Sequence, residues 1–242
     1  MNPGVAAHLP LAQGDDFFQE RSDTGCVQEN GFFCAQWAFE NFDRYMSPLL
    51  EHIVLVSVSV FAGFAIAIGL AVLSHGRRWL VPPLLGLTGV LYTIPSLAFF
   101  ILLLPITGFG RMTAIVALTA YTLQIIYRNV VAGLANVPAA SKDAGRGMGM
   151  TDQQLLWRVE LPLAVPELVA GLRIATVSTV AIATLAVFAG AGGLGDPLLK
   201  DITFRTNVIV AGGLAILLAI AFDALLVLAG RVASPWRKVR PV

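Results

Sequence analysis

The chain has 242 residues, of which 57% are hydrophobic and 13% charged, and its mean hydropathy is +0.77. So few polar groups cannot cover the surface of a soluble globule, and the composition therefore indicates an integral membrane protein. The formal net charge of +1 gives no indication of a nucleic-acid partner, so the orientation has to come from where the charges lie.

Residues 1–49 form an acidic, polar start that we expect outside the membrane. Residues 1–14 lack a basic region followed by a long apolar core, which argues against a cleaved signal peptide and predicts an uncleaved first span. The two cysteines of the chain are Cys26 and Cys34. In an oxidising compartment they can close a small loop by a disulfide, and the alternative is two unpaired thiols.

The stretch just before the first apolar run is predicted to lie along the membrane surface. As a helix it places five apolar side chains roughly on one face, namely Trp37, Phe42, Tyr45, Met46 and Leu49. Aromatic side chains gathered in this way are typical of an interfacial helix.

Five apolar runs follow, near residues 50–73, 84–104, 112–134, 166–189 and 207–229. At a rise of about 1.5 Å per residue, each run can cross a hydrocarbon core of about 30 Å. Runs of this length satisfy their own backbone hydrogen bonds in lipid as helices. The sequence therefore predicts an all-α membrane protein with a membrane domain over 50–230 and a basic tail over 231–242.

The basic residues predict the orientation. If the N-terminal tail lies outside, the larger group falls on the cytoplasmic side: Arg77, Arg78, Arg128, Lys142, Arg146, Arg158, Arg231, Arg237, Lys238 and Arg240. A smaller group falls outside: Arg21, Arg44, Arg111, Lys200 and Arg205. The positive-inside rule then predicts an external N-terminus, a cytoplasmic C-terminus and a cytoplasmic segment at 135–165.

Polar residues interrupt three of the runs. Tyr92, Thr93, Pro95 and Ser96 break the second run, where a proline frees a carbonyl that neighbours or cavity water must satisfy. This break is either the wall or gate of a pathway, or a kink packed on other helices. Arg173 and Asp223, in the fourth and fifth runs, are functional candidates as charges within the membrane. The alternatives for them are snorkelling or pairing with each other.

Four glycines follow the fourth run: Gly190, Gly192, Gly193 and Gly195. Three of them fit the dinucleotide pattern G-x-G-x-x-G, but that pattern needs a preceding strand, and here it follows a predicted membrane helix. We interpret the segment as a turn or re-entrant stretch near an external gate, where glycine lets backbones approach closely. The sequence contains no P-loop pattern, and the spacing of its histidines and cysteines predicts no catalytic or metal site.

The long polar interruption DAGRGMGMTDQQLLWRVELP covers residues 143–162. Residues 139–148 can form a short helix that the glycines at its end loosen. Thr151 offers an N-cap and Gln154 a capping box for a second short helix, whose end Pro162 is expected to mark. Leu155, Leu156 and Val159 share one face of it. Such an exposed apolar face usually meets a partner groove, and the alternative is packing on the inner ends of the chain's own spans.

The spacing of this segment resembles the EAA loop of ABC importer permeases. That pattern is Glu-Ala-Ala, three residues, Gly, nine residues, Ile, one residue and Leu-Pro, and here it is matched by Asp143, Ala144, Gly145, Gly149, Val159, Leu161 and Pro162. The resemblance implies that the segment is a coupling helix that docks into a cleft on a cytoplasmic ATPase subunit. Asp143 is one methylene shorter than Glu, and Gly145 weakens the helix by about 1 kcal/mol, which leaves open whether the usual acidic contact is kept or shifted.

Three further stretches resemble the osmoprotectant branch of the MetI-like permeases, which serves glycine betaine, choline and carnitine: YTIPSLAFF at 92–100, YRNVVAGLANVP at 127–138 and GAGGLGD at 190–196. The resemblance implies a five-helix permease core in a bacterial cytoplasmic membrane and a transport subunit rather than an enzyme. The implied partners are a second copy or a paralogous permease, a cytoplasmic ATPase dimer that holds ATP and Mg, an extracytoplasmic solute-binding protein and membrane lipid.

Three alternatives remain at this point. The chain can be an ABC permease for methionine or another amino acid, since methionine permeases share a similar glycine-rich external segment. It can also be an ion-coupled secondary transporter that uses Arg173 and Asp223, although no inverted repeat is evident. The third alternative is a membrane anchor or assembly factor with no transport role.

Overall fold

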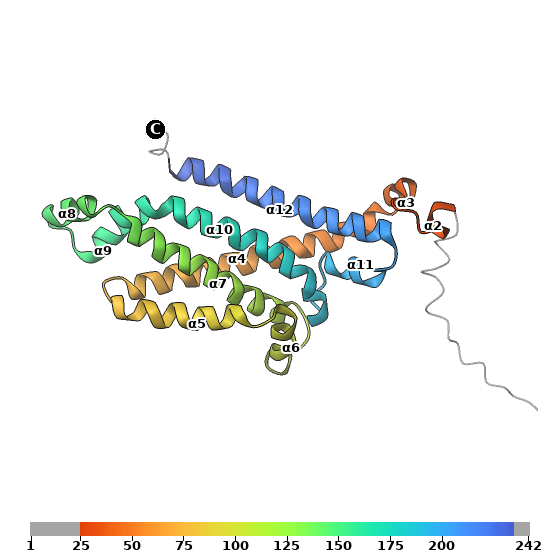
Figure 1. Ribbon diagram of the computed structural model, residues 1–242, viewed down its shortest axis with the longest axis horizontal. Helices are drawn as coiled ribbons and strands as arrows, with labels where there is room; N and C mark the ends of the chain where they lie inside the picture. Colours follow the sequence, from red (N-terminus) through yellow and green to blue (C-terminus); the bar gives the residue numbers. More distant parts are fainter. Residues whose placement is uncertain (1–24, 235–242) are drawn as a thin grey trace, which may run out of the picture.

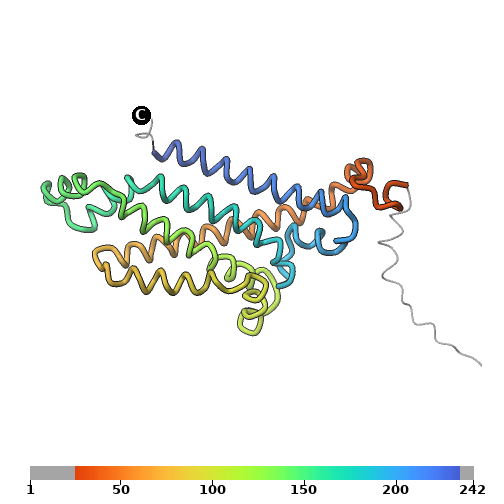
Figure 2. Tube along the Cα trace, in the orientation of Figure 1, coloured from red at the N-terminus to blue at the C-terminus, as the bar shows by residue number. Residues whose placement is uncertain are grey.

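The computed structural model describes residues 25–234, which are nearly all helical and include no strand (Figures 1 and 2). Residues 1–24 and 235–242 lie outside this range. The predictions made for the first residues of the chain, for Arg21 and for the last basic residues, Arg237, Lys238 and Arg240, therefore lie outside the described residues.

Figure 1 colours the helices by their order in the sequence. They are α2 (Gly25–Gln28), α3 (Ala35–Glu40), η1 (Phe42–Tyr45), α4 (Met46–Ser74), η2 (Arg78–Leu80), α5 (Val81–Thr93), α6 (Ser96–Thr107), α7 (Arg111–Asn136), α8 (Ala139–Gly147), α9 (Asp152–Leu155), η3 (Leu156–Glu160), α10 (Leu161–Ala183), η4 (Thr184–Ala189), α11 (Gly195–Lys200) and α12 (Arg205–Ala233). Of the short η elements, η3 is a π-helix and the others are 3-10 helices.

Helix α7 lies at the centre of the bundle, with α4, α5 and α10 packed on it and α12 packed on α10. One buried cluster, around Leu118 and Phe100, fills the half near α6 and η4. A second, around Ile126 and Ala164, fills the half near α8 and α9. The bundle therefore has two ends: α8, α9 and the last turn of α12 at one, and α2, α3, α6 and α11 at the other (Figure 1).

Four helical stretches are long and apolar enough to cross a membrane: Phe42–Ser74, Arg111–Asn136, Asp152–Ala189 and Arg205–Ala233. They correspond to four of the five predicted runs. The second predicted run is broken, as its proline and polar residues had indicated: α5 and α6 meet at an angle of 99° and count as a fifth span only if taken together. Pro95 explains the break, since its ring disfavours helical backbone at Ile94, which is extended at φ −65° and ψ 127°.

The prediction of a single apolar face before the first span was wrong. Tyr45 is buried, and Trp37 packs edge-on against Phe204 with ring centroids 4.7 Å apart, whereas Phe42 and Met46 are exposed. The 3-10 helix η1 separates α3 from α4. Its tighter turn of about three residues rotates the side chains that follow away from the register of one straight α-helix.

The second short helix was predicted to end at Pro162, and this prediction was wrong. Helices α9, η3 and α10 run on as one helical stretch, and Pro162 lies in the first turn of α10. In the π-helical turn before it, the backbone N–H of Leu161 donates to the carbonyl of Leu156, five residues earlier. Proline has no N–H to donate, and a local π-helical adjustment is one way in which a membrane helix tolerates that loss.

Candidate functional site

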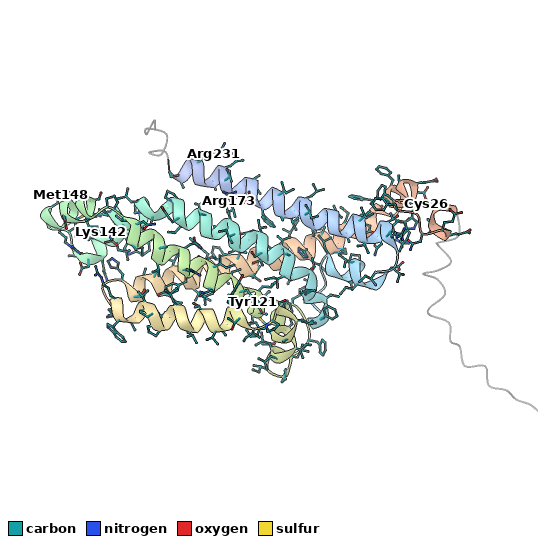
Figure 3. All side chains as sticks on the ribbon, in the orientation of Figure 1. Cys26, Tyr121, Lys142, Met148, Arg173 and Arg231 are labelled. Carbon is teal, nitrogen blue, oxygen red and sulfur yellow. A yellow bond between two sulfur atoms is a disulfide. The ribbon has the colours of Figure 1, made fainter. Side chains whose placement is uncertain are left out.

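Helices α8 and α9 form a helix–turn–helix at one end of the bundle, where Met148 marks its tip (Figure 3). The predicted capping box is present: Thr151 Oγ1 accepts from the backbone N–H of Gln154 at 3.3 Å, and Gln154 Oε1 accepts from the backbone N–H of Thr151 at 3.0 Å. Gly149 has φ +79°, a conformation that glycine adopts without strain. The turn thus depends on Gly149, and the start of α9 depends on Thr151.

Gly145 lets the two short helices touch. A Cβ at this position would lie 2.6 Å from Leu155 Cδ1, so with an alanine the Leu155 side chain or α8 itself would have to shift. The helix propensity lost at Gly145 is therefore exchanged for close packing on Leu155.

The apolar face predicted to meet a partner is covered by the chain itself. Leu155 and Leu156 are 1% and 2% exposed, and Leu156 packs in the same cluster as Ile126. For these two side chains the structure follows the alternative, packing on the inner ends of the spans. The exposed large apolar side chains of the loop are instead Met148 and Trp157, at 70% and 56%.

The remaining positions of the loop divide between surface and core. The Asp143 side chain is 73% exposed, with Arg146 Nη1 3.9 Å from its Oδ1, and Ala144 is exposed beside it. Val159 and Pro162 are half-buried, and Leu161 is buried. The surface open to a partner therefore includes Asp143, Ala144, Arg146, Met148 and Trp157.

At the opposite end, the break between α5 and α6 is closed by Tyr121 of α7. Its hydroxyl donates to the carbonyl of Ile94, and its ring meets those of Tyr92 and Phe99 edge-on at 5.8 and 5.7 Å. Thr93 Oγ1 donates to the carbonyl of Val90 at 2.7 Å. Pro95 and Ser96 begin α6. A neighbouring side chain, rather than the helix itself, thus satisfies a carbonyl at the break.

The glycine segment is a tight turn held against α4. Gly190, Gly192 and Gly193 have φ +72°, +76° and +82°. A Cβ on Gly192 would collide with Glu51 Oε2, and one on Gly195 with the carbonyl of Thr184. Within residues 25–234 no strand precedes these glycines, so the dinucleotide interpretation lacks the context that it needs.

Two α4 residues that sequence reasoning missed hold this turn. Glu51 Oε2 accepts from the backbone N–H of Gly193 at 3.1 Å, and His52 Nδ1 accepts from that of Leu194 at 3.2 Å. Because Nδ1 accepts, the hydrogen of a neutral ring is on Nε2, which donates to the carbonyl of Val180 at 3.1 Å. Arg111 Nη2 lies 2.7 Å from Glu51 Oε1. No local pattern could reveal contacts that are 142 residues apart in sequence.

The break and the glycine turn meet at this end of the bundle. Phe99 and Phe100 of α6 share a buried cluster with Ala186 and Ala189 of η4. The backbone N–H of Gly110, which follows α6, donates to the carbonyl of Ala189 at 2.7 Å. The two predicted gate segments thus form one packed unit at the end opposite α8 and α9.

Residues 46–233 match the family described as binding-protein-dependent transport system inner membrane component. The chain belongs to this permease family. It is therefore a transport subunit rather than an enzyme, and in such systems a separate ATPase subunit hydrolyses ATP.

Curated relatives of this permease carry substrate names. It is 38% identical over 197 residues to the osmoprotectant import permease protein OsmW of Salmonella typhimurium, a match that covers 78% of this chain and 92% of that protein. It is 35% identical over 202 residues to the choline transport system permease protein OpuBB of Bacillus subtilis, covering 83% and 93% of the two chains.

Solved structures share the fold of the permease. A chain of the MetNI methionine ABC transporter in an inward-facing conformation aligns with a TM-score of 0.68 and 26% identity, over 81% of this chain and 96% of that one. An amino acid ABC transporter crystallised with histidines aligns with the same TM-score at 17% identity, which shows the fold alone.

The permease also has an N-terminal clasp, which we define as the contacts between residues 26–37 and the start of α12. Cys26 and Cys34 form a disulfide. Asn30 Nδ2 donates to the carbonyl of Thr203 at 2.8 Å, and Asn30 Oδ1 accepts from the backbone N–H of Arg205 at 3.1 Å. The disulfide loop thus fixes the first turn of α12.

The two charges within the membrane runs pair with each other. Arg173 Nε and Nη2 lie 2.7 and 2.8 Å from the two oxygens of Asp223, which joins α10 to α12. This is the pairing weighed in the sequence analysis. Both oxygens of Asp223 thus accept from Arg173 in a two-point ion pair that links the two helices.

Proposed function

We propose that the protein is the membrane subunit of an ATP-driven importer for small osmoprotectants of the glycine betaine, choline and carnitine type. The names of relatives at 33–38% identity support this substrate class. The methionine transporter that shares the fold is less similar, at 26%, which favours osmoprotectants over methionine. An extracytoplasmic solute-binding protein would deliver the solute.

The surface at the tip of the α8–α9 loop carries this proposal. The loop exposes the apolar side chains Met148 and Trp157 together with charged ones of both signs, among them Asp143 and Arg146. Exposed Met and Trp beside a charged group are typical of a protein interface. We assign this surface to a cytoplasmic ATPase subunit. A second permease, identical or paralogous, would bring a second loop to the second ATPase.

The orientation proposed here follows from the basic residues. Arg77 follows the last turn of α4, Arg146 belongs to α8 and Arg231 is in the last turn of α12, whereas Arg111 and Arg205 begin α7 and α12. Figure 1 shows the first three of these helix ends on the side of α8 and α9, and the other two on the side of α6 and α11. The positive-inside rule then puts the α8–α9 end in the cytoplasm and the glycine turn outside, in a bacterial cytoplasmic membrane. The disulfide in the N-terminal clasp suits an oxidising exterior.

In the proposed cycle, ATP-driven closure of the ATPase dimer would pull the two α8–α9 loops together and turn the spans outward. The solute would enter beside the break and the glycine turn, and hydrolysis would reset the assembly. Such a change requires only that the ATPase bind one state better than the other. This chain supplies the docking surface, and ATP and Mg would bind to the ATPase.

Reconstitution tests the proposal. The permease, its ATPase and its binding protein would be placed in proteoliposomes, and uptake of radiolabelled glycine betaine, choline, carnitine and methionine would be measured with and without ATP. We expect ATP-dependent uptake of at least one quaternary ammonium solute and none of methionine. Uptake driven by a proton or sodium gradient without ATP would contradict the proposal, as would ATP hydrolysis with no solute movement.

A further inference from the structure

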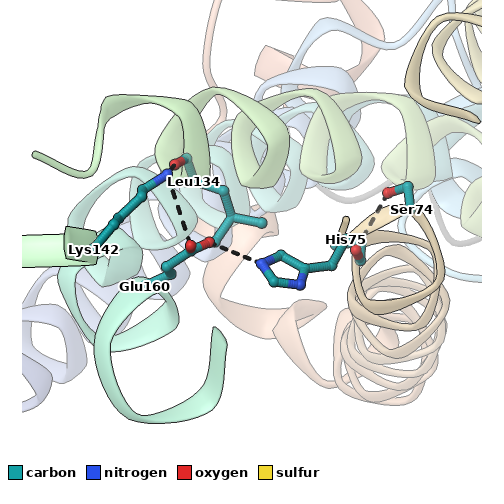
Figure 4. A network of polar contacts seen from close by, with 6 residues as sticks. Ser74, His75, Leu134, Lys142 and Glu160 are labelled. Carbon is teal, nitrogen blue, oxygen red and sulfur yellow. Dashed lines mark hydrogen bonds and ion pairs between the residues drawn. The ribbon is translucent and has the colours of Figure 1, made fainter. Parts of the chain in front are cut away.

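Glu160 lies within the EAA-like segment but is no part of the motif, and it is the one carboxylate of the segment that is buried. Glu160 is 4% exposed. Oε2 lies 3.1 Å from His75 Nε2, and Oε1 lies 3.8 Å from Lys142 Nζ (Figure 4). Lys142 Nζ also donates to the carbonyl of Leu134 at 2.9 Å. These four residues form what we call the Glu160 hub.

The hub joins four elements that are separate in the sequence. Glu160 ends η3, Lys142 belongs to α8, Leu134 is in the last turn of α7, and His75 caps the end of α4. A buried carboxylate is costly unless it is paired and hydrogen-bonded. The cationic Lys142 is also placed where the negative end of the α7 dipole favours it. Each contact thus supports the others, so the four elements are held as one unit.

Helix α8 contributes one residue to the hub and the next residue to the proposed ATPase surface. Lys142 points into the hub, whereas its neighbour Asp143 is exposed beside Arg146. Because Asp143 and Lys142 are adjacent in α8, a displacement of the exposed surface also displaces the residue that contacts Glu160. The π-helical η3 that carries Glu160 is a type of turn that recurs at functional sites.

Helix α4 extends from the hub to the other end of the bundle. His75 caps its last turn, and Glu51 and His52 near its start bind the backbone of the glycine turn. Glu51 and His75 are 24 positions apart in the sequence, which corresponds to about 36 Å along a helix that rises 1.5 Å per residue. One rigid helix thus has a polar contact with the coupling loop at one end and with the proposed gate at the other.

We propose that Glu160 is a positioning residue that couples movement of the α8–α9 loop to α4, and through α4 to the glycine turn. This rests on the proposed function. In the coupled state, the carboxylate holds His75 and Lys142 together, so that α8 and α4 move as one. Without that carboxylate, the loop still binds the ATPase, but its movement no longer reaches α4.

The test compares Glu160→Gln and His75→Gln with a control, Glu167→Gln. Glu167 is a half-buried carboxylate in the first turns of α10 and makes no hydrogen bond or ion pair within the described part of the chain. Three quantities would be measured in proteoliposomes: the amount of ATPase bound, the rate of ATP hydrolysis, and the solute moved per ATP hydrolysed. Lys142→Arg, which keeps the charge, serves as the conservative variant.

We expect both hub variants to bind the ATPase normally and to hydrolyse ATP, while solute moved per ATP falls about tenfold, the change expected from losing one charge-assisted contact. Glu167→Gln and Lys142→Arg should keep the wild-type ratio. The double variant Glu160→Gln/His75→Gln should be no worse than either single variant, because both remove the same link.

An unchanged ratio of solute to ATP in both hub variants would overturn the role of Glu160. So would a loss confined to the amount of folded protein, because a merely structural role lowers stability without changing the ratio. If Glu160→Gln does not fold, His75→Gln still decides, since that side chain is 17% exposed and its replacement leaves no large cavity. Wild-type protein that moves no solute with ATP would instead refute the proposed function.

Discussion

Glu51 of α4 binds the backbone N–H of Gly193 at 3.1 Å, although 142 residues separate the two in sequence. The same carboxylate lies 2.7 Å from Arg111 Nη2, at the start of α7. One side chain thus joins α4 and α7 to the turn between α10 and α12. Both Gly192 and Gly193 have a left-handed backbone, and an added Cβ would meet the Glu51 carboxylate at Gly192 and the His52 ring at Gly193, so the fold requires glycine at both positions.

Replacing Gly192 by alanine tests this arrangement. Its φ of +76° strains any L-residue, and the new methyl group would displace the Glu51 carboxylate. We expect a loss of stability of about 1–3 kcal/mol, measured by thermal unfolding in detergent, together with reduced uptake. The matched control is Gly212→Ala, where the added methyl group meets open space inside α12. That variant should be neutral or stabilising, and an equal loss in both would argue against the role of Glu51.

Reduction of the disulfide should loosen the N-terminal clasp. A bridge that closes a loop of this size contributes about 2–3 kcal/mol through the unfolded chain, and here it also presents Asn30 to the start of α12. We expect dithiothreitol to lower the apparent Tm of the wild type. The double variant Cys26→Ser/Cys34→Ser should have the lower Tm without any reductant, and dithiothreitol should not change that Tm further. A wild-type Tm that does not respond to reduction would contradict this.

The pair of Arg173 and Asp223 distinguishes ATP-driven import from ion-coupled transport. We expect Asp223→Asn to destabilise the α10–α12 packing, because it leaves Arg173 without its anion, and the charge-swapped double variant Arg173→Asp/Asp223→Arg to recover part of that loss. Uptake by Asp223→Asn should remain dependent on ATP and insensitive to a proton gradient. Loss of a proton-driven component of wild-type uptake in Asp223→Asn would show that the pair carries protons.

Local patterns were enough to predict much of the fold. Four of the five predicted apolar runs correspond to long helices, because a segment in lipid must satisfy its own backbone and so forms a helix whatever its neighbours are. The capping box of Thr151 and Gln154 formed as predicted, since both partners lie within one turn. The break at Pro95 was visible as well, but its angle of 99° depends on how α6 packs against η4.

The sequence was less informative wherever the partner is distant. Leu155 and Leu156 look like a free apolar face, and only the return of α9 against Gly145 and α7 shows that they are covered. His52 and Glu160 resembled isolated polar residues because their partners are far away along the chain. Sequence spacing therefore located the candidate loop, whereas its exposed surface and its buried hub depend on tertiary packing.

Gly149 provides the most direct test of the central claim that the α8–α9 loop couples ATP hydrolysis to transport. Gly149→Asp puts a carboxylate and a strained φ of +79° at the turn, where an added Cβ meets no neighbouring atom within 4 Å, so the protein should insert and fold. Gly147→Asp is the control, since it adds the same charge two residues away without a positive φ.

The decisive measurement is the ratio of glycine betaine, choline or carnitine moved to ATP hydrolysed in proteoliposomes. We expect Gly149→Asp to lower this ratio at least about tenfold, within the usual range of coupling free energies, while Gly147→Asp has a smaller effect. A wild-type ratio in membrane-inserted Gly149→Asp protein would contradict the assignment of this loop as the coupling element.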